Sequence, residues 1–148
     1  MLDALVAFLA LPGVVAIAVP IALVSARHPD AHTRGAAGAL FVVGGVLLLW
    51  CVREFYVVGR GTLAPWAPPR HLVVSGPYRY SRNPMYIAVG LILGGWTVLY
   101  WSPALLIYLI VVSTAFQLRV LLREEPSMAR SFGSAWESYR ARTKRWLL

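Results

Sequence analysis

Three long stretches without Asp, Glu, Lys, Arg or His constrain this chain more than any other feature of its sequence. They cover residues 4–26, 35–52 and 83–118 and are 23, 18 and 36 residues long. A helix needs about 20 apolar residues to cross the hydrocarbon core of a membrane. The longest stretch is therefore sufficient for two crossings, with a turn at Trp101-Ser102-Pro103 near its middle.

The amino-acid composition excludes a soluble domain of this size. Hydrophobic residues make up 59% of the 148 residues, and a chain this short exposes too much surface to enclose them in one water-surrounded core. We therefore predict an all-α membrane protein that forms a single integral membrane domain over residues 1–148, with a cytoplasmic, amphipathic, helical C-terminal tail. Its four transmembrane helices are expected at about residues 4–26, 35–58, 84–101 and 103–122.

The positive charges gather on one side of the predicted membrane. Of the fourteen Lys and Arg residues, eleven lie in residues 59–82 and 119–148, and two lie in the loop at 27–34. This asymmetry is typical of the positive-inside rule, and it explains the net charge of +8 without nucleic-acid binding. It predicts that both termini and the middle loop face the cytoplasm. Thirteen Arg residues against one Lys indicate a bacterial chain, so we expect the bacterial inner membrane.

The single cysteine, Cys51, offers no chemistry of its own. One cysteine cannot form an internal disulfide, and no metal-ligand spacing surrounds it. We expect no metal site, and we expect Cys51 to be a small apolar residue of the second span.

Proline and glycine mark the ends of the later helices. The pairs Asn83-Pro84 and Ser102-Pro103 are typical of an N-cap followed by proline at the first helical position. The fourth helix is expected to run to about residue 122 and no further than the residue before Pro126. Gly133 is expected to break the chain, and residues 134–137 then have the sequence of a capping box at the start of a short helix.

A cation and a pair of carboxylates are placed at the cytoplasmic ends of the third and fourth helices. Arg82 lies immediately before the third helix, whose free N–H groups form an anion site. Glu124 and Glu125 end the fourth helix, and carboxylates at a membrane boundary are costly unless they are paired or solvated. One interpretation is an ordinary salt-bridged helix end, with basic side chains such as Arg119 as partners. The other is a site that brackets a zwitterion, with its carboxylate at Arg82 and its ammonium at the Glu pair.

Short motifs in the second half of the chain resemble those of a known family in their order and spacing. They are Gly76-Pro77-Tyr78-Arg79, Arg82-Asn83-Pro84-Met85-Tyr86, Glu124-Glu125, Phe132-Gly133, Tyr139 and Arg145. The family is the superfamily of isoprenylcysteine carboxyl methyltransferases and phospholipid methyltransferases, and the resemblance covers about residues 60–146. Its enzymes are integral membrane proteins that hold S-adenosylmethionine at the cytoplasmic face, between this helical hairpin and the tail, while a lipophilic acceptor enters from the bilayer.

The resemblance implies a cofactor-binding region over about residues 76–146. The cofactor would be S-adenosylmethionine, released as S-adenosylhomocysteine; O-, N- and S-methyl transfer stay open. Arg82 and Glu125 are expected to be the catalytic residues, and the partners to be the lipid membrane and a lipophilic methyl acceptor. The residues expected to bind the cofactor are Arg82, Asn83, Tyr86, Glu124, Glu125, Tyr139 and Arg145.

Three positions depart from the pattern of this family. Asn83 stands where the family has His, so any proton-transfer role of that imidazole is missing. Ala88 replaces a common Gly, and the chain ends without the terminal Pro. None of these changes removes a charged ligand-binding position. The first two spans, where only apolar packing can be recognised, are expected to form the pocket that selects the acceptor.

Two other classes of protein compete with the methyltransferase interpretation. A small four-helix transporter usually needs an ionisable residue in mid-membrane, whereas Asp3, Glu54 and the Glu pair all lie at predicted helix ends. A non-catalytic membrane adaptor of the same fold would not need Arg82 and the Glu pair. The sequence therefore favours a methyltransferase over both.

Overall fold

The computed structural model describes residues 9–24, 34–59 and 71–147, and these form helices and loops without any strand. In chain order the helical elements are a π-helix at Leu9–Ala18, α2 at Val19–Val24, α3 at Arg34–Val57, a 3₁₀ turn at Gly76–Arg79, α4 at Pro84–Tyr100, α5 at Pro103–Arg119, a π-helical turn at Val120–Glu124, and α6 at Glu125–Arg142. The prediction of an all-α fold is confirmed for this part of the chain.

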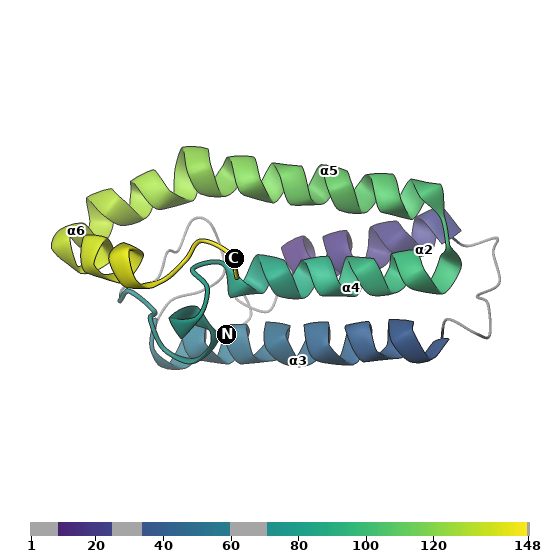
Figure 1. Cartoon of the computed structure of the whole chain (residues 1–148), viewed down its shortest axis with the longest axis horizontal. Coiled ribbons are helices and arrows are strands. Elements are labelled where there is room, and N and C mark those ends of the chain that lie inside the picture. The colour runs from purple at the N-terminus through teal and green to yellow at the C-terminus, as the bar shows by residue number, and fades with distance from the viewer. Residues whose placement is uncertain (1–8, 25–33, 60–70, 148) are drawn as a thin grey trace.

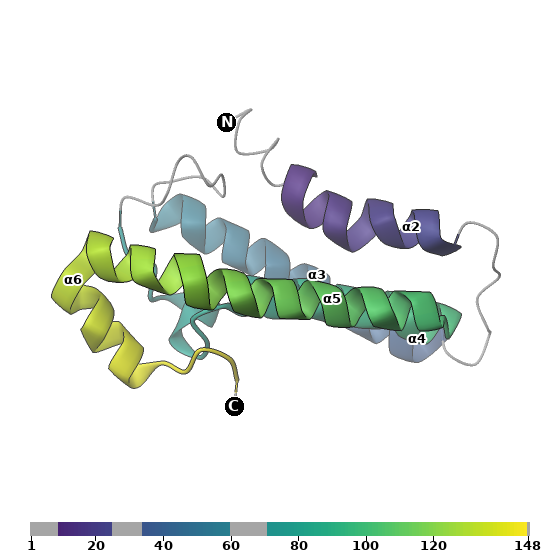
Figure 2. The same ribbon diagram turned by 90° about the horizontal axis from the view of Figure 1, so that it is seen from above.

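Helix α4 is the central element of the bundle. It contacts α3, α5 and the two N-terminal helical segments, and Figure 1 shows α3, α4 and α5 running side by side along the longest axis. The view from above shows α6 turning back at one end, so that the C-terminal tail lies across the bundle (Figure 2). The ends of α3 and α5 and the start of α4 thereby meet at the same end of the molecule (Figure 1).

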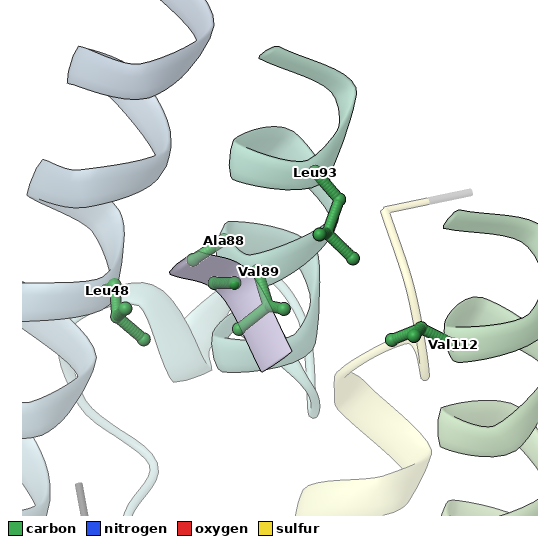
Figure 3. Close-up of a cluster of buried hydrophobic side chains, with 6 residues drawn as sticks. Leu48, Ala88, Val89, Leu93 and Val112 are labelled. Carbon is green, nitrogen blue, oxygen red and sulfur yellow. The ribbon is translucent and has the colours of Figure 1, made fainter. Parts of the chain in front are cut away.

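The apolar core lies along α4 and is built from small and branched side chains. Leu48 of α3, Val89 and Leu93 of α4, and Val112 of α5 are buried and converge there (Figure 3). Gly44 lets α3 approach α4 closely, because a Cβ at this position would lie 2.9 Å from the backbone oxygen of Ala88. The helix pair is therefore held at a spacing that only a residue without a side chain permits.

The π-helix at Leu9–Ala18 is joined to the bundle by hydrogen bonds to its backbone carbonyls. Trp96 Nε1 donates to Ala16 O at 2.9 Å, and Tyr108 Oη donates to Val15 O at 3.1 Å. The wider π-helical turn disturbs the regular ladder of backbone hydrogen bonds, and side chains from α4 and α5 satisfy two of its carbonyls. The predicted first span at residues 4–26 is thus helical where the structure describes it, and its ends lie outside the described residues.

Two of the described helices are long and apolar enough to cross a membrane, Arg34–Val57 and the continuous helix Pro103–Arg142. Two shorter apolar helices accompany them, Gly13–Val24 and Pro84–Tyr100. Large apolar side chains are exposed on the outer faces, as at Val42, which is 66% exposed. These surfaces fit a surrounding of lipid better than one of water.

The predicted end of the fourth helix before Pro126 was wrong, because α5 continues into α6 without a break; the end of the fourth span at about residue 122 stays a prediction. Proline inside a helix lacks one N–H and clashes with the carbonyl four residues earlier. Here the π-helical turn at Val120–Glu124 precedes Pro126, and this wider turn takes up the irregularity. Gly133 does interrupt the helix, with φ 49° and ψ −123°.

The predicted side-chain hydrogen bonds that would cap the helix starts are also not formed among the described residues. Asn83 and Ser102 occupy the N-cap positions of α4 and α5, but neither side chain makes a capping hydrogen bond. No capping box forms at residues 134–137 in the described part of the chain; Glu137 contacts Arg140 at 3.8 Å instead. Helix α6 begins at Glu125, upstream of the expected start, but the kink at Gly133 divides it, so a short helix does follow residue 133 as expected.

A buried carboxylate fixes the loop that leads into α4. Glu54 of α3 is 6% exposed, accepts a hydrogen bond from Ser75 Oγ, and pairs with Arg53 Nη1 at 3.1 Å. Gly76 has φ +55°, and a Cβ there would lie 2.9 Å from Glu54 Cγ. The backbone of the 3₁₀ turn therefore lies directly against Glu54. Residues 60–70 of the predicted middle loop lie outside the described residues.

Candidate functional site

The charged residues predicted from the sequence meet at one end of the bundle. Arg82 lies just before α4, Glu124 ends the π-helical turn, and Glu125 begins α6. The tail beyond α6 then folds back toward the start of α4 and brings Arg145 to the same place (Figure 2). Residues more than sixty positions apart in sequence therefore contribute to one cluster.

Glu125 is the centre of this cluster. Arg145 donates two parallel hydrogen bonds to its carboxylate, from Nε at 2.8 Å and from Nη2 at 2.9 Å. Arg82 Nη1 lies 2.9 Å from Glu125 Oε1, and the two side chains are 8% and 14% exposed. Burial alone would raise the pKa of the Glu125 carboxyl, but the Arg145 hydrogen bonds and the Arg82 charge outweigh it and lower this pKa below its ordinary value.

Arg82 is incompletely satisfied in this environment. Its guanidinium lies 5.5 Å from the centre of the Trp136 ring, which is a favourable position for a cation. Among the described residues, however, Nε and Nη1 have no hydrogen-bond acceptor, since the contact with Glu125 is close but poorly aligned. Burial lowers the pKa of the Arg82 guanidinium, and the neighbouring Glu125 charge opposes this shift. A buried donor without an acceptor is costly, so these N–H groups are available to an anionic ligand.

Glu124 has partners different from those of its neighbour. Tyr86 Oη donates a hydrogen bond to Glu124 Oε1, and Arg119 Nε contacts the same oxygen at 2.7 Å. Side chains of consecutive helical residues point about 100° apart, which explains why the two carboxylates enter different networks. Arg82 and Glu125 are in direct contact, and the bracketing of a zwitterion by Arg82 and the Glu pair stays a prediction.

The tail is fastened by hydrogen bonds to the segment before α4. Arg82 N donates to Lys144 O at 2.9 Å, while Ser81 Oγ and Asn83 Nδ2 both donate to Arg145 O at 3.1 Å. Asn83 therefore holds the tail with its side-chain amide instead of capping α4. This accounts for an Asn at a position where a capping role was expected.

Tyr139 has a structural partner close to the cluster. Its hydroxyl donates to the backbone oxygen of Tyr78 at 2.7 Å, and both side chains are buried. Burial raises the pKa of the Tyr139 hydroxyl, so it stays protonated and keeps this hydrogen bond. Tyr139 thereby joins α6 to the 3₁₀ turn that precedes Arg82.

A pocket of about 350 Å³ adjoins the cluster between α4 and α5. Two of its lining residues, Tyr86 and Phe116, stack with their ring centres 4.2 Å apart. A third, Trp146, donates a hydrogen bond from Nε1 to Gln117 Oε1 at 2.9 Å. The residues lining it are Tyr86, Ile87, Gly90, Ser113, Phe116, Gln117 and Trp146.

Most lining residues of this pocket were missed by sequence reasoning. Only Tyr86 was predicted. Gln117 offered a signal, because it is an amide inside an otherwise apolar helix and lies on one helical face with the Glu pair. Trp146 offered none, since its place depends on the tail folding back onto α5.

The apolar helices and the charged cluster at their end define a helical membrane protein with a polar site at one end of the bundle. The family model for phospholipid methyltransferase matches residues 33–135. The chain therefore belongs to the phospholipid methyltransferase family, within the superfamily of isoprenylcysteine carboxyl and phospholipid methyltransferases. Membership of this family indicates methyl transfer as the activity.

The match includes Arg82, Tyr86 and the Glu pair but ends before Tyr139 and Arg145. These two later residues are connected to the family's site only by the contacts described above. No curated protein and no solved structure matches the chain.

Proposed function

We propose that this protein is an S-adenosylmethionine-dependent methyltransferase that acts on a lipophilic acceptor of the membrane. The observation that carries the proposal is the Arg82–Glu125–Arg145 cluster, in which a buried guanidinium has N–H groups without an acceptor among the described residues. The apolar pocket is connected to this end of the bundle by Tyr86, which lines it and donates a hydrogen bond to Glu124. A ligand with an anionic and a cationic end fits such a cluster, because it can satisfy the free N–H groups of Arg82 and still meet a carboxylate.

The residues of the cluster fit the amino-acid end of S-adenosylmethionine. Arg82 would hold its carboxylate through Nε and Nη1, the two donors without an acceptor among the described residues. Glu125 or Glu124 would accept from its ammonium or its ribose hydroxyls, while Asn83, Tyr139 and Arg145 keep the tail closed over the site. When bound, this cofactor supplies an activated methyl group.

The protein contributes alignment and exclusion of water to such a reaction. The backbone N–H of Arg82 donates a hydrogen bond to Lys144 O of the tail. The two parallel hydrogen bonds from the Arg145 guanidinium fix the orientation of the Glu125 carboxylate. Arg82 and Glu125 are accordingly the residues to which we assign the catalytic role. Tyr86 lines the pocket, and its hydrogen bond to Glu124 keeps the hydroxyl pointed toward the charged cluster.

We further propose that all four apolar helices cross the membrane, which we take to be a bacterial inner membrane. Both termini and the charged site would face the cytoplasm, in agreement with the distribution of Lys and Arg. Helix α4 has 17 residues, a length of about 25 Å, which is at the lower limit for a span.

The test is binding of S-adenosylmethionine to the purified full-length chain in detergent. We expect saturable binding by the wild type and a loss of about tenfold or more in Glu125→Gln and in Arg82→Ala, since charge-assisted hydrogen bonds contribute about 1.5–3 kcal/mol. Glu137→Gln is the matched control, because its exposed carboxylate lies outside the cluster. Absence of saturable binding by the wild type would contradict the proposal and leave a transporter or a non-catalytic adaptor as the interpretation.

A further inference from the structure

The pocket between α4 and α5 extends from the charged cluster into the apolar part of the bundle. The end of the pocket nearer the cluster contains Tyr86, which donates a hydrogen bond to Glu124, and Trp146, which follows Arg145 in the sequence. Gly90 lies six residues beyond Pro84 and Ser113 lies six residues before Arg119, so both are about 9 Å inside their helices. The deeper part of the pocket therefore lies within the stretch 83–118, which contains no charged side chain.

The outer side of this pocket is open. Ser113 lines the pocket and is itself exposed. Ile110, on the same face of α5 and about one turn away, is 57% exposed. No segment of the described chain covers this apolar face of α5. In a membrane-spanning bundle, an apolar surface of this kind contacts lipid, so the pocket opens toward the bilayer.

Gly90 makes the deeper part of the pocket wide. A Cβ at Gly90 would meet no atom within 4 Å, whereas one at Gly44 would lie 2.9 Å from Ala88 O. Gly90 is therefore not required by helix packing, although glycine inside a helix is unfavourable relative to alanine. The absence of a side chain at Gly90 leaves space in the pocket, which Ser113 lines from α5.

The chemistry of the lining fits a hydrocarbon chain better than a nucleoside. Apart from the aromatic residues, Ser113 and Gln117 are the only hydrogen-bonding side chains among the described residues that line the pocket, and the oxygen of Gln117 already accepts from Trp146. Buried polar groups of a ligand need hydrogen-bond partners, and an adenosine would find few here. Aromatic and aliphatic walls instead favour an apolar ligand.

We propose that this pocket binds the apolar chain of the methyl acceptor next to its reacting group, and that Gly90 and Ser113 determine the size of the chain that is accepted. The inference rests on the proposed function. It places the selection of the acceptor on α4 and α5, where the sequence had led us to expect the first two spans. The hydrogen bond between Trp146 and Gln117 joins the tail to α5 at this pocket.

The experiment uses the full chain in lipid nanodiscs and a photoactivatable hexadecyl amphiphile as the probe. The measured quantity is the share of labelling on α4 and α5 that excess unlabelled amphiphile abolishes. We expect saturable labelling of the wild type, and an apparent affinity about tenfold lower in Gly90→Leu and in Ser113→Leu, as when about two methylene groups lose their burial. The two variants fill the pocket from opposite walls, so each checks the other, and Gly90→Ala is a smaller change if either fails to fold.

Gly45→Leu is the matched control, because a Cβ at Gly45 also meets no atom within 4 Å but the residue lies outside the pocket. Binding of S-adenosylmethionine by Gly90→Leu is expected to equal that of the wild type. Labelling that is not saturable, or that both leucine variants leave unchanged, would overturn the inference. So would loss of cofactor binding in Gly90→Leu with labelling retained, since the pocket would then hold the cofactor. Saturable, leucine-sensitive labelling without any cofactor binding would support the pocket and contradict the proposed function.

Discussion

Glu125 is the residue on which the charged cluster depends. Its carboxylate contacts the guanidinium groups of both Arg82 and Arg145, so its loss would leave two cations facing each other. Breaking a buried ion pair by removing one partner costs about 3–5 kcal/mol. Glutamine keeps the shape and one acceptor oxygen, and we therefore expect a cost nearer the lower end of that range.

The contribution of Glu125 to stability should depend on pH. Because its folded-state pKa is lowered, the stabilisation is fully present above the ordinary carboxyl pKa of about 4.3 and is lost as the pH falls through the lowered value. We expect the gap in thermal unfolding temperature between wild type and Glu125→Gln to be constant near neutral pH and to close in acid. Thermal unfolding in detergent across this range measures it, with Glu137→Gln as the exposed control. A gap that widens in acid would contradict the assigned ion pairs.

The identity of the charged residues was predictable, but most of their partners were not. Arg82 and the Glu pair stand out because charge is rare in an apolar chain, and ionisable groups near a membrane need a reason. The Asn83 side chain could cap α4 or donate a hydrogen bond to the tail, and which of the two it does depends on the position of Arg145 O. That position is set by the folding of α6, which no local pattern around Asn83 records.

At the scale of helices, the close contact between α3 and α4 depends on Gly44. We predict that Gly44→Ala destabilises the protein by about 1–3 kcal/mol, the usual range for overpacking, because the new methyl group would meet the backbone oxygen of Ala88. A backbone atom cannot rotate away, so the two helices must separate. Gly45→Ala, one residue along the same helix, meets no atom within 4 Å and should be neutral or slightly stabilising. Thermal unfolding of the pair distinguishes packing from helix propensity; equal effects would exclude the packing explanation.

The length of the charge-free apolar stretches predicted the helices well, whereas the helix ends were harder to predict. The starts of α4 and α5 at Pro84 and Pro103 were correct, because proline at a first helical position has a local cause. The continuation of α5 into α6 was missed, because a π-helical turn before Pro126 has no comparable signal in the sequence.

At the scale of the whole molecule, chemistry is confined to one end of an apolar bundle. The tail crosses back over the start of α4, so residues near positions 82, 125 and 145 form one site although the chain between them runs the length of α4 and α5 (Figure 1). This arrangement keeps charged groups out of the stretch that lipid would surround. The proposed crossing of the membrane by α4 and α5 requires that the site and the α4–α5 turn lie on opposite sides of the membrane.

That requirement gives a prediction about topology. Cys51 is fully buried and is the only cysteine of the chain, so a Cys51→Ala background allows single cysteines to be placed at will. Trp101, at the α4–α5 turn, is 73% exposed, and Ser134 on α6 is also exposed. In intact bacterial cells, a membrane-impermeant maleimide should label Trp101→Cys but should reach Ser134→Cys only after the membrane is disrupted, because the basic side of the protein stays in the cytoplasm. Labelling of both positions in intact cells would mean that α5 does not cross the membrane, and the reverse pattern would place the charged site outside, away from a cytoplasmic supply of cofactor.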